Sequence, residues 1–251
     1  MKLQRILIAN AKGGCGKTTI ATNIASHYAA QNLNVRLFDH DRQGSSLAWI
    51  DRRPQTENLI HSVDASKNAD HRLTRSWQLR VPPETDVAVI DTQAGVDILE
   101  LVALFQTNDS VLIPVLPSPI DIHATAQFIE DLLTTCRTQS KVIRLAVIAN
   151  RVRKNTVMYH SLERFLFSLN TPFISSLRDT QLYNKAVELG IGVQEISSHR
   201  IKIDRDQWAP IIRWLDSPVA RESAEVRPLF NQSESQTKRQ PNPAFIRSHK
   251  F

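Results

Sequence analysis

The feature that most constrains the fold of this chain is a glycine-rich run that joins an apolar segment to a helical pattern. Residues 3–9 have the short apolar character of a strand, and the glycine-rich run follows almost at once. Backbone N–H groups can converge on phosphate oxygens only where glycine leaves room, and the start of the next helix adds a partial positive charge. A strand, such a loop and a helix in this order predict a phosphate-binding loop. The loop consists of Lys12, Gly13, Gly14, Cys15, Gly16, Lys17, Thr18 and Thr19.

The last side chains of the loop predict how a nucleoside triphosphate is held. Lys17 is expected to reach the β- and γ-phosphates, and Thr18 is expected to place its hydroxyl on Mg²⁺. Thr19 is in position for the α-phosphate. A glycine-rich turn that binds no nucleotide is the alternative, and the combination of strand, loop and helix argues against it. We therefore expect ATP and Mg²⁺ as cofactors.

Short β-branched segments alternate with helix-length segments along most of the chain. This alternation predicts one doubly wound α/β domain over residues 1–216, with a mostly parallel sheet flanked by helices. Residues 52–80 are polar with weak periodicity, and we expect a helix and irregular connections there. Strands are predicted at Leu3–Ala9, Val35–Asp39, Val87–Asp91, Val111–Val115 and Leu145–Asn150, with a short edge strand at Pro172–Ile174. Helices are predicted at Thr18–Ala30, 122–137, 156–169, Thr180–Leu189 (closed by Gly190) and 207–215.

Composition limits the remaining possibilities. Residues 217–251 are rich in Pro, Ser, Gln and Asn, which predicts a basic tail that is disordered or ordered only on a partner. No apolar run is long enough to span a membrane and no signal peptide is visible, so we expect a cytoplasmic protein. The two cysteines, Cys15 and Cys136, argue against a disulfide framework, a zinc site or a Cys₄ cluster within one chain.

Carboxylates follow two of the predicted strands. Asp39 and Asp41 end the strand at 35–39, and Asp91 ends the strand at 87–91. Ligands of parallel sheets bind at the carboxyl ends of the strands, and Mg²⁺ with a triphosphate typically takes one or two carboxylates. For one such residue a strand-end turn is the simpler explanation, whereas all of them together favour a metal and phosphate site.

The loop departs from the usual pattern, because Ala11 stands in the place of the first glycine and a second lysine, Lys12, follows it. This form resembles the ParA/MinD family of deviant Walker ATPases. The resemblance implies the P-loop NTPase fold and a homodimer in the ATP state, in which Lys12 contacts the phosphates bound by the other subunit. A solvated loop lysine is the alternative. Cys15 stands where the family usually carries a small apolar residue, and we expect it to replace that residue in packing.

Both acidic segments also resemble the switches of this family. The resemblance implies that Asp41 positions or activates the attacking water, that Asp39 lies near the metal and that Asp91 contacts Mg²⁺ through water. Gln93 stands where many relatives have proline, and its freer φ is expected to loosen the second switch. The matching runs are Asp39-His40-Asp41-Arg42-Gln43 and Asp91-Thr92-Gln93-Ala94-Gly95.

Two later segments extend the resemblance. The run from Pro114 to Ser118, with Asp121, is similar to the family's segment after the fourth strand. Asn150 and Arg151 are similar to the strand-end pair that contacts the adenine edge. An Asn amide offers both a donor and an acceptor, which suits a purine, although a single Asn at a strand end is more often a turn residue.

The charge of the chain favours a polyanionic partner. Its net charge is +6 and its pI is near 9.5, which is compatible with nucleic acid but common in other proteins. The resemblance implies that the ATP dimer binds nonspecific double-stranded DNA of the nucleoid and positions a cargo, and that a ParB-like or other adaptor stimulates hydrolysis. A solvated surface charge is the alternative at each position. The candidate DNA contacts are Arg178, Lys185, Arg200, Lys202, Arg205 and Arg213.

Three other functions of related proteins fit the sequence less well. A membrane-associated protein like MinD needs an amphipathic C-terminal helix, whereas residues 236–251 contain two prolines and few bulky apolar side chains. An iron–sulfur carrier needs paired cysteines. A tyrosine kinase of this fold would want a tyrosine-rich tail, and all three tyrosines precede residue 184.

Overall fold

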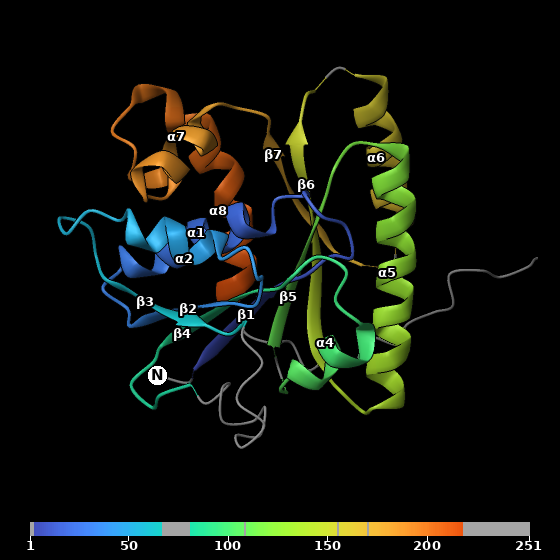
Figure 1. The fold of residues 1–251 in the computed structure, drawn as a ribbon. Helices are drawn as coiled ribbons and strands as arrows, with labels where there is room; N and C mark the ends of the chain where they lie inside the picture. The colour runs from blue at the N-terminus through green and yellow to red at the C-terminus, as the bar shows by residue number, and fades with distance from the viewer. Residues whose placement is uncertain (1–2, 67–80, 108, 155, 170, 218–251) are drawn as a thin grey trace, which may run out of the picture.

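The computed structural model describes residues 3–66, 81–107, 109–154, 156–169 and 171–217. Its centre is a seven-stranded sheet in the order β3-β2-β4-β1-β5-β6-β7, and all neighbouring strands are parallel (Figure 1). The predicted α/β fold with a parallel sheet is confirmed. The strands are β1 (Gln4–Ile8), β2 (Val35–Asp39), β3 (Ile60–Asp64), β4 (Val87–Asp91), β5 (Asp109–Val115), β6 (Ile143–Val152) and β7 (Phe173–Arg178).

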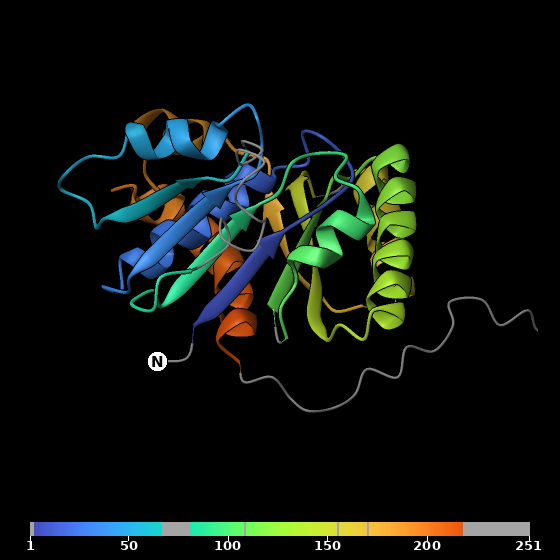
Figure 2. The same ribbon diagram turned by 60° about the horizontal axis from the view of Figure 1, so that its bottom comes forward.

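Helices cover both faces of the sheet (Figures 1 and 2). One face is covered by α1 (Lys17–Ala29), α2 (Ser45–Asp51), α7 (Leu182–Leu189) and α8 (Lys202–Asp216), with the short 3₁₀ helices η1 (Val193–Glu195) and η2 (His199–Ile201) between the last two. The other face is covered by α4 (Ile98–Leu104), α5 (Pro119–Thr138) and α6 (Val157–Ser168).

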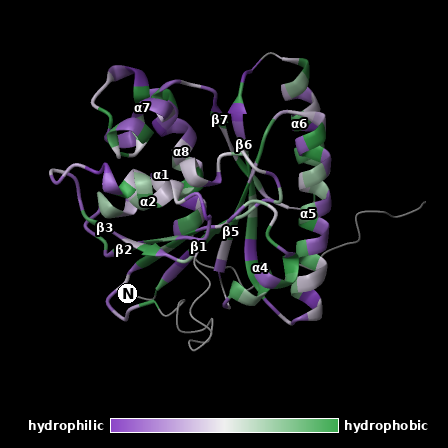
Figure 3. Ribbon diagram, viewed as in Figure 1, coloured by the Kyte–Doolittle hydropathy of each residue, from purple (hydrophilic) through white to green (hydrophobic). Residues whose placement is uncertain are grey.

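Two apolar cores form because successive residues of a strand point to opposite faces of the sheet. In β1, Ile6 and Ile8 belong to the core under α1, whereas Leu7 belongs to the core under α5. The central strands β4 and β5 are buried along their whole length, as expected for a parallel sheet covered on both sides. Figure 3 shows the same pattern, with hydrophobic residues along the central strands.

Most of the predicted elements are confirmed. The five central strands differ from their predicted ends by at most two residues, and the predicted edge strand is β7, which extends to Arg178. All five predicted helices are present, but α8 begins at Lys202 rather than at residue 207. Gly190 closes α7 with a φ of 66°, as expected of a helix C-terminus.

The prediction for residues 52–80 was wrong in its described part. Residues 60–64 form the edge strand β3, which pairs in parallel with β2 from Val35↔Ile60 to Asp39↔Asp64. Only Ile60 of this strand is buried, so the segment lacks the apolar run that marks a central strand. The seven-residue helices α2 and α4 were also not predicted, because one or two turns carry little periodicity.

Two predictions concern residues outside the described ranges. The predicted tail lies there apart from Ser217, and so does the segment 236–251 that was considered for a membrane helix. The division into a domain over 1–216 and a tail over 217–251 therefore stays a prediction. Within the described residues, no helix is both long and apolar enough to cross a membrane.

Gly190 is the position where one added methyl group is expected to cost much stability. A Cβ there would lie 2.5 Å from backbone atoms of Arg52 and Arg53, whereas Gly95 has the same φ of 66° and nothing within 4 Å. Gly95→Ala should therefore show the left-handed penalty alone, about 1–2 kcal/mol. Gly190→Ala should lose roughly 2 kcal/mol more, because backbone must move. Urea unfolding of both variants tests this expectation, and equal losses would contradict it.

Candidate nucleotide site

The carboxyl ends of three neighbouring strands meet beside the phosphate loop. In the register of the sheet, Ile8 of β1 and Asp39 of β2 both pair with Asp91 of β4. The loop leaves the sheet directly after β1, so the two carboxylates lie at the edge from which it leaves. This is the edge at which parallel sheets bind their ligands.

Two glycines and a buried lysine give the loop its shape. Gly14 and Gly16 have φ angles of 74° and 97°, which residues with a Cβ rarely adopt. A Cβ at Gly16 would also lie 2.1 Å from the Nδ2 atom of Asn150. Lys17 is only 7% exposed, and its Nζ donates to the carbonyl oxygen of Lys12 at 3.1 Å. The ammonium group of Lys17 therefore lies against the inside of the loop.

Asp39 organises the segment that follows β2. It is fully buried, and one carboxylate oxygen accepts from the N–H of Asp41 at 2.9 Å. The other oxygen accepts from the N–H groups of Ser46 (3.0 Å) and Leu47 (3.3 Å) in the first turn of α2. These bonds join the segment after β2 to the first turn of α2. Asp39 thus fixes the segment that carries Asp41, and its expected place near the metal stays a prediction.

Asp91 is a buried carboxylate whose charge is only partly compensated. One oxygen accepts from the Ser46 hydroxyl at 2.5 Å and Thr18 is a further donor, whereas Oδ1 has no hydrogen-bond partner among the described residues. Burial raises the pKa of Asp91 to about 6, and the charge of Asp39 adds to the rise. The bonds from Ser46 and Thr18, together with the charge of Lys17, limit it.

This arrangement fits an Mg²⁺ ion that is bound together with a nucleotide. Asp91 offers a buried oxygen without a partner, and Thr18 offers a hydroxyl beside it. Protein-bound Mg²⁺ typically keeps several waters and takes one or two carboxylates plus phosphate oxygens. Among the described residues there is no group of three or more His, Cys, Asp or Glu that could hold a metal. The phosphates and water would therefore supply most of the ligands.

Lys12 and Asp41 have few partners within the subunit. The backbone N–H of Lys12 donates to Asn10 at 3.2 Å, but its ammonium group forms no ion pair or hydrogen bond in the described part of the chain. One carboxylate oxygen of Asp41 accepts from the N–H of Gln43 at 3.0 Å, which is a local turn contact. Both side chains are half-buried, so both retain polar atoms that can reach a ligand.

The second acidic segment is tied to the phosphate loop at two points. The hydroxyl of Thr92 donates to the carbonyl oxygen of Ile8 at 2.8 Å. The N–H of Gly95 donates to the carbonyl oxygen of Ala11 at 3.0 Å. Gln93, which stands where many relatives have proline, lies between these two hydrogen bonds. The segment is therefore held on both sides of Gln93. The expected loosening of this switch stays a prediction.

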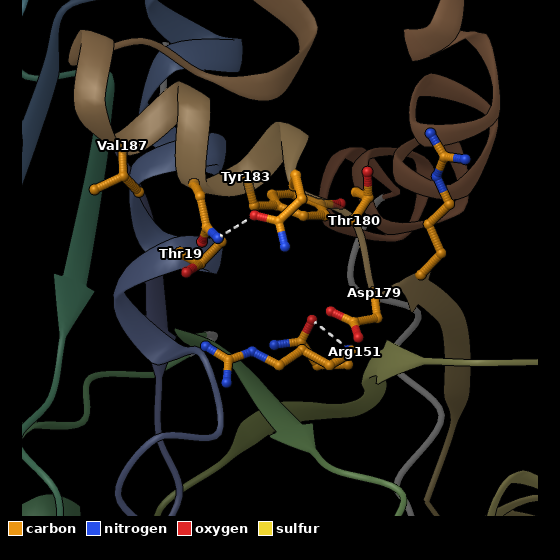
Figure 4. A pocket seen from close by; sticks show the side chains of 10 residues that line it. Thr19, Arg151, Asp179, Thr180, Tyr183 and Val187 are labelled. Atoms are coloured by element: carbon orange, nitrogen blue, oxygen red, sulfur yellow. Dashed lines mark hydrogen bonds between the residues drawn. The ribbon is translucent and has the colours of Figure 1, made fainter.

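A pocket of about 320 Å³ adjoins the phosphate loop at Thr19. Figure 4 shows Arg151 on one side of this space and Tyr183 on the other. Its volume lies at the lower end of the range for small-molecule pockets, which suits a nucleobase whose phosphates are bound elsewhere. The pocket is lined by Thr19, Asn150, Arg151, Arg178, Asp179, Thr180, Gln181, Tyr183, Asn184 and Val187.

Asn150 joins this pocket to the phosphate loop. Its Nδ2 donates to the carbonyl oxygen of Cys15 at 2.8 Å, and its Oδ1 accepts from the N–H of Arg151 at 2.9 Å. Arg151 has a φ of 50°, in the left-handed region, and its N–H is held by that bond. One amide hydrogen and one lone pair of Asn150 remain for another partner, which is compatible with its predicted contact to adenine.

The sequence analysis missed the role of the turn after β7 and of α7, which together supply six of the ten residues that line the pocket. Asp179 and Thr180 follow the strand directly, and Tyr183, Asn184 and Val187 belong to α7. The edge strand was predicted to end at Ile174, whereas β7 extends to Arg178, so the turn at 179–181 was not placed at the carboxyl end of a strand, where ligands of parallel sheets bind.

The predicted basic residues fall into two groups. The guanidinium of Arg178 donates to both carboxylate oxygens of fully buried Asp204, at 2.9 and 2.7 Å, and to the carbonyl oxygen of Arg200. Arg178 therefore holds the start of α8 in place. The others are exposed on α7, η2 and α8; they are Lys185, Arg200, Lys202, Arg205 and Arg213.

Cys15 is part of the packing of the loop, as expected. It is 1% exposed, and its thiol donates to the carbonyl oxygen of Lys12 at 3.3 Å. Burial raises the pKa of this thiol above its usual value, although Lys17 works against the rise. The thiolate, which is the reactive form, is therefore disfavoured at neutral pH.

A glycine loop between β1 and α1, beside two aligned strand-end carboxylates, defines a P-loop nucleotide-binding protein. Residues 6–193 match the family model described as the CobQ/CobB/MinD/ParA nucleotide binding domain. The chain belongs to this family, and the ParA/MinD resemblance of the loop is confirmed. The ParA and MinD proteins of this family are ATPases.

Known relatives agree with this assignment. The "Maintenance of carboxysome distribution protein A" of Halothiobacillus neapolitanus is 31% identical over 194 residues, which cover 77% of this chain and 88% of that protein. Two solved structures share the fold. MinD of Aquifex aeolicus has a TM-score of 0.65 at 17% identity, with 86% of this chain and 99% of that chain covered. A McdA–ATP complex from Cyanothece has a TM-score of 0.61 at 16% identity, with 85% and 96% covered.

Asp91→Asn should stabilise the nucleotide-free protein at neutral and alkaline pH. The pKa of Asp91 is raised from 3.8 to about 6, so the folded protein binds this proton more tightly than the unfolded chain does. The stability gained from the bound proton is full below pH 3.8 and is lost as the pH rises through 6. A rise of this size corresponds to a loss of about 3 kcal/mol. The uncharged Asn avoids this loss, so the Tm advantage of the variant in Mg²⁺-free buffer should grow between pH 4 and 7. Asp131→Asn, at an exposed position of α5, is the matched control. An advantage that does not change with pH would refute the expectation.

Proposed function

We propose that this chain is an ATPase of the ParA type that forms an ATP-dependent sandwich dimer, binds nonspecific DNA and positions or segregates a cargo. The observation that carries the proposal is Lys12, a second lysine in the phosphate loop whose ammonium group has no partner in the described part of its own subunit. Hydrolysis, stimulated by a ParB-like or other adaptor, would release the DNA. Such a protein would work in the cytoplasm at the nucleoid.

Hydrolysis in this site would depend on positioning and on neutralising phosphate charge. Lys17 would bind the β- and γ-phosphates, and Thr18 and Asp91 would hold Mg²⁺, which when bound neutralises charge on the phosphates. Asp41 would position or activate the attacking water. Its alignment depends on Asp39, whose carboxylate fixes the backbone from Asp41 to the start of α2. Asn150 and Arg151 would contact the adenine.

Lys12 supports a dimer because the inside of the loop already contains Lys17. The Lys17 ammonium lies 3.1 Å from the Lys12 carbonyl oxygen, inside the loop. The Lys12 ammonium has no such contact among the described residues, so it can bind a ligand outside its own loop. In a two-fold dimer, each loop would receive Lys12 from the other subunit. The phosphates of a bound nucleotide would give the Lys12 ammonium of each subunit its anionic partner, which makes the proposed dimer depend on ATP.

The outer side of α8 supports the proposed DNA contact. Lys202, Arg205 and Arg213 are spaced by three and eight residues, which places them on one side of the helix. The opposite side, with Trp208 and Leu215, is buried against the sheet. Cations on one exposed stripe would bind phosphates with little sequence preference and with a steep salt dependence.

The cargo is proposed from the relatives. The relative from Halothiobacillus neapolitanus is named for the maintenance of carboxysome distribution. This name supports a large protein assembly as one kind of cargo, and a plasmid or chromosome origin is the other kind that we propose.

Removing the cations of α8 should weaken DNA binding and its salt dependence together. In the triple variant Lys202→Ala, Arg205→Ala and Arg213→Ala, each lost cation should lower the salt slope by about one. Affinity for a random-sequence duplex should fall at least about tenfold. Fluorescence anisotropy with ATP and Mg²⁺ measures both, with ADP as the low-affinity reference.

The control for this experiment is the double variant Arg137→Ala and Arg164→Ala. Both residues are exposed, and they lie on α5 and α6 across the sheet from α8. The control removes two cations and the test variant three, so losses of affinity and salt slope in that proportion would show that total charge, rather than the α8 stripe, determines binding.

Lys12→Ala should abolish the ATP-dependent dimer while the subunit still binds ATP. Lys17, Thr18 and the pocket beside Thr19 remain intact in this variant, so nucleotide binding needs no contribution from Lys12. Sedimentation with a non-hydrolysable ATP analogue measures the dimer, and a fluorescent analogue measures binding. Lys17→Ala is the matched control and should lose both. A Lys12→Ala protein that still dimerises would disprove the cross-subunit role.

A further inference from the structure

An exposed ion pair borders the pocket beside the phosphate loop. The carboxylate of Asp179 lines the pocket, and Figure 4 shows it directed into the space between Arg151 and Tyr183. Both the Nε and the Nη2 of Arg153 donate to its Oδ2, at 2.9 and 2.6 Å. Arg153 itself is not part of the lining. Its connection to the pocket is the pair of hydrogen bonds to Asp179.

The stability of the fold does not account for this pair. The Arg153 side chain is 77% exposed and that of Asp179 is 35% exposed. Ion pairs that are this open to water contribute little to folding. The backbone of Asp179 is held independently, since its N–H donates to the carbonyl oxygen of Val152 at 3.0 Å. What the pair does change is the number of acceptor positions that Asp179 presents to the pocket.

Those positions can be counted. A carboxylate has about four lone-pair directions, two on each oxygen. Both directions of Oδ2 are used by the two N–H groups of Arg153, and no described residue donates to Oδ1. Asp179 therefore offers the pocket one oxygen rather than two. Of the ten residues that line the pocket, it is the only carboxylate.

Adenine and guanine differ in what they require of such a group. The guanine edge carries two adjacent donors, N1–H and the 2-amino group, which together suit both oxygens of a free carboxylate. The adenine edge carries one amino donor beside an acceptor nitrogen, so a single oxygen is sufficient. A site that leaves a donor of the wrong base unpaired discriminates against that base.

We propose that the Arg153–Asp179 pair is the determinant that makes this pocket prefer adenine to guanine nucleotides. Arg153 is a positioning residue that occupies Oδ2, and Asp179 contacts the base through Oδ1. This inference rests on the proposed nucleotide binding and adds its selectivity. Without Arg153, both oxygens of Asp179 become available and guanine gains a two-point contact.

The test compares the affinities for ATP and GTP by competition against a fluorescent ADP analogue. The native chain should prefer ATP, and Arg153→Met should reduce the ATP-to-GTP preference about tenfold, chiefly through tighter GTP binding. Adding Asp179→Asn to that variant should restore the preference, because an amide presents one acceptor and one donor to the adenine edge. A gain in GTP affinity cannot result from a damaged fold, because damage to the fold would weaken the binding of both ATP and GTP.

The matched control is Arg164→Met, which removes an exposed arginine of α6 that does not line the pocket. It should leave both affinities unchanged. If the native chain binds ATP and the preference of Arg153→Met stays within about twofold of native, the inference is overturned and nucleotide binding stands. If the native chain binds neither nucleotide, the proposed function fails and the inference fails with it.

Discussion

The site depends on one constraint of the sheet, which is that β2 and β4 end in register with a buried carboxylate each. Asp39 and Asp91 are direct neighbours, so two charges must be accommodated where water is excluded. Both oxygens of Asp39 accept hydrogen bonds from backbone N–H groups, including that of Ser46. Asp91 retains an oxygen without a partner in the described structure, and its pKa is raised to about 6. A cation brought with phosphate would remove this imbalance, which links the stability of the fold to its ligand.

How much could be predicted from the sequence depended on whether the signal was local. The phosphate loop and the central strands are contiguous patterns, and they were predicted closely. The edge strand β3 was missed because only Ile60 is buried, so it carries no apolar run. The pocket wall after β7 was missed because the strand was predicted to end at Ile174, whereas it extends to Arg178 and the turn follows there. The bond from Arg178 to Asp204, 26 residues further on, was also not predicted, and the DNA contact of Arg178 stays a prediction.

The segment between α7 and α8 contacts α1, the residues after α2, and α8, which is the helix with the basic stripe. In α1, the Asn23 side chain accepts from the N–H of Val193 at 2.6 Å. Beyond α2, Arg53 forms a bidentate pair with Glu195, and both side chains are almost fully buried. Arg205 of α8 donates to the carbonyl oxygen of Gln194 at 3.1 Å. The contacts of Asn23 and Arg53 are buried and costly to break singly, so they hold the segment between α7 and α8 against the side of the phosphate loop. The bond from Arg205 is exposed and adds little to this.

Arg178 gives the pocket and α8 a residue in common. It lines the pocket, while its guanidinium binds Asp204 and its N–H donates to Gln207 at 3.0 Å, both in α8. A base bound in this pocket, as proposed, would adjoin the same residue that binds the helix with the basic stripe. Displacing it would leave Asp204, which is fully buried, without its cation, and an unpaired buried charge is among the most costly defects in a protein. Arg178 is consequently constrained from the α8 side, so the pocket wall it forms is rigid, and a base must fit that wall as it stands.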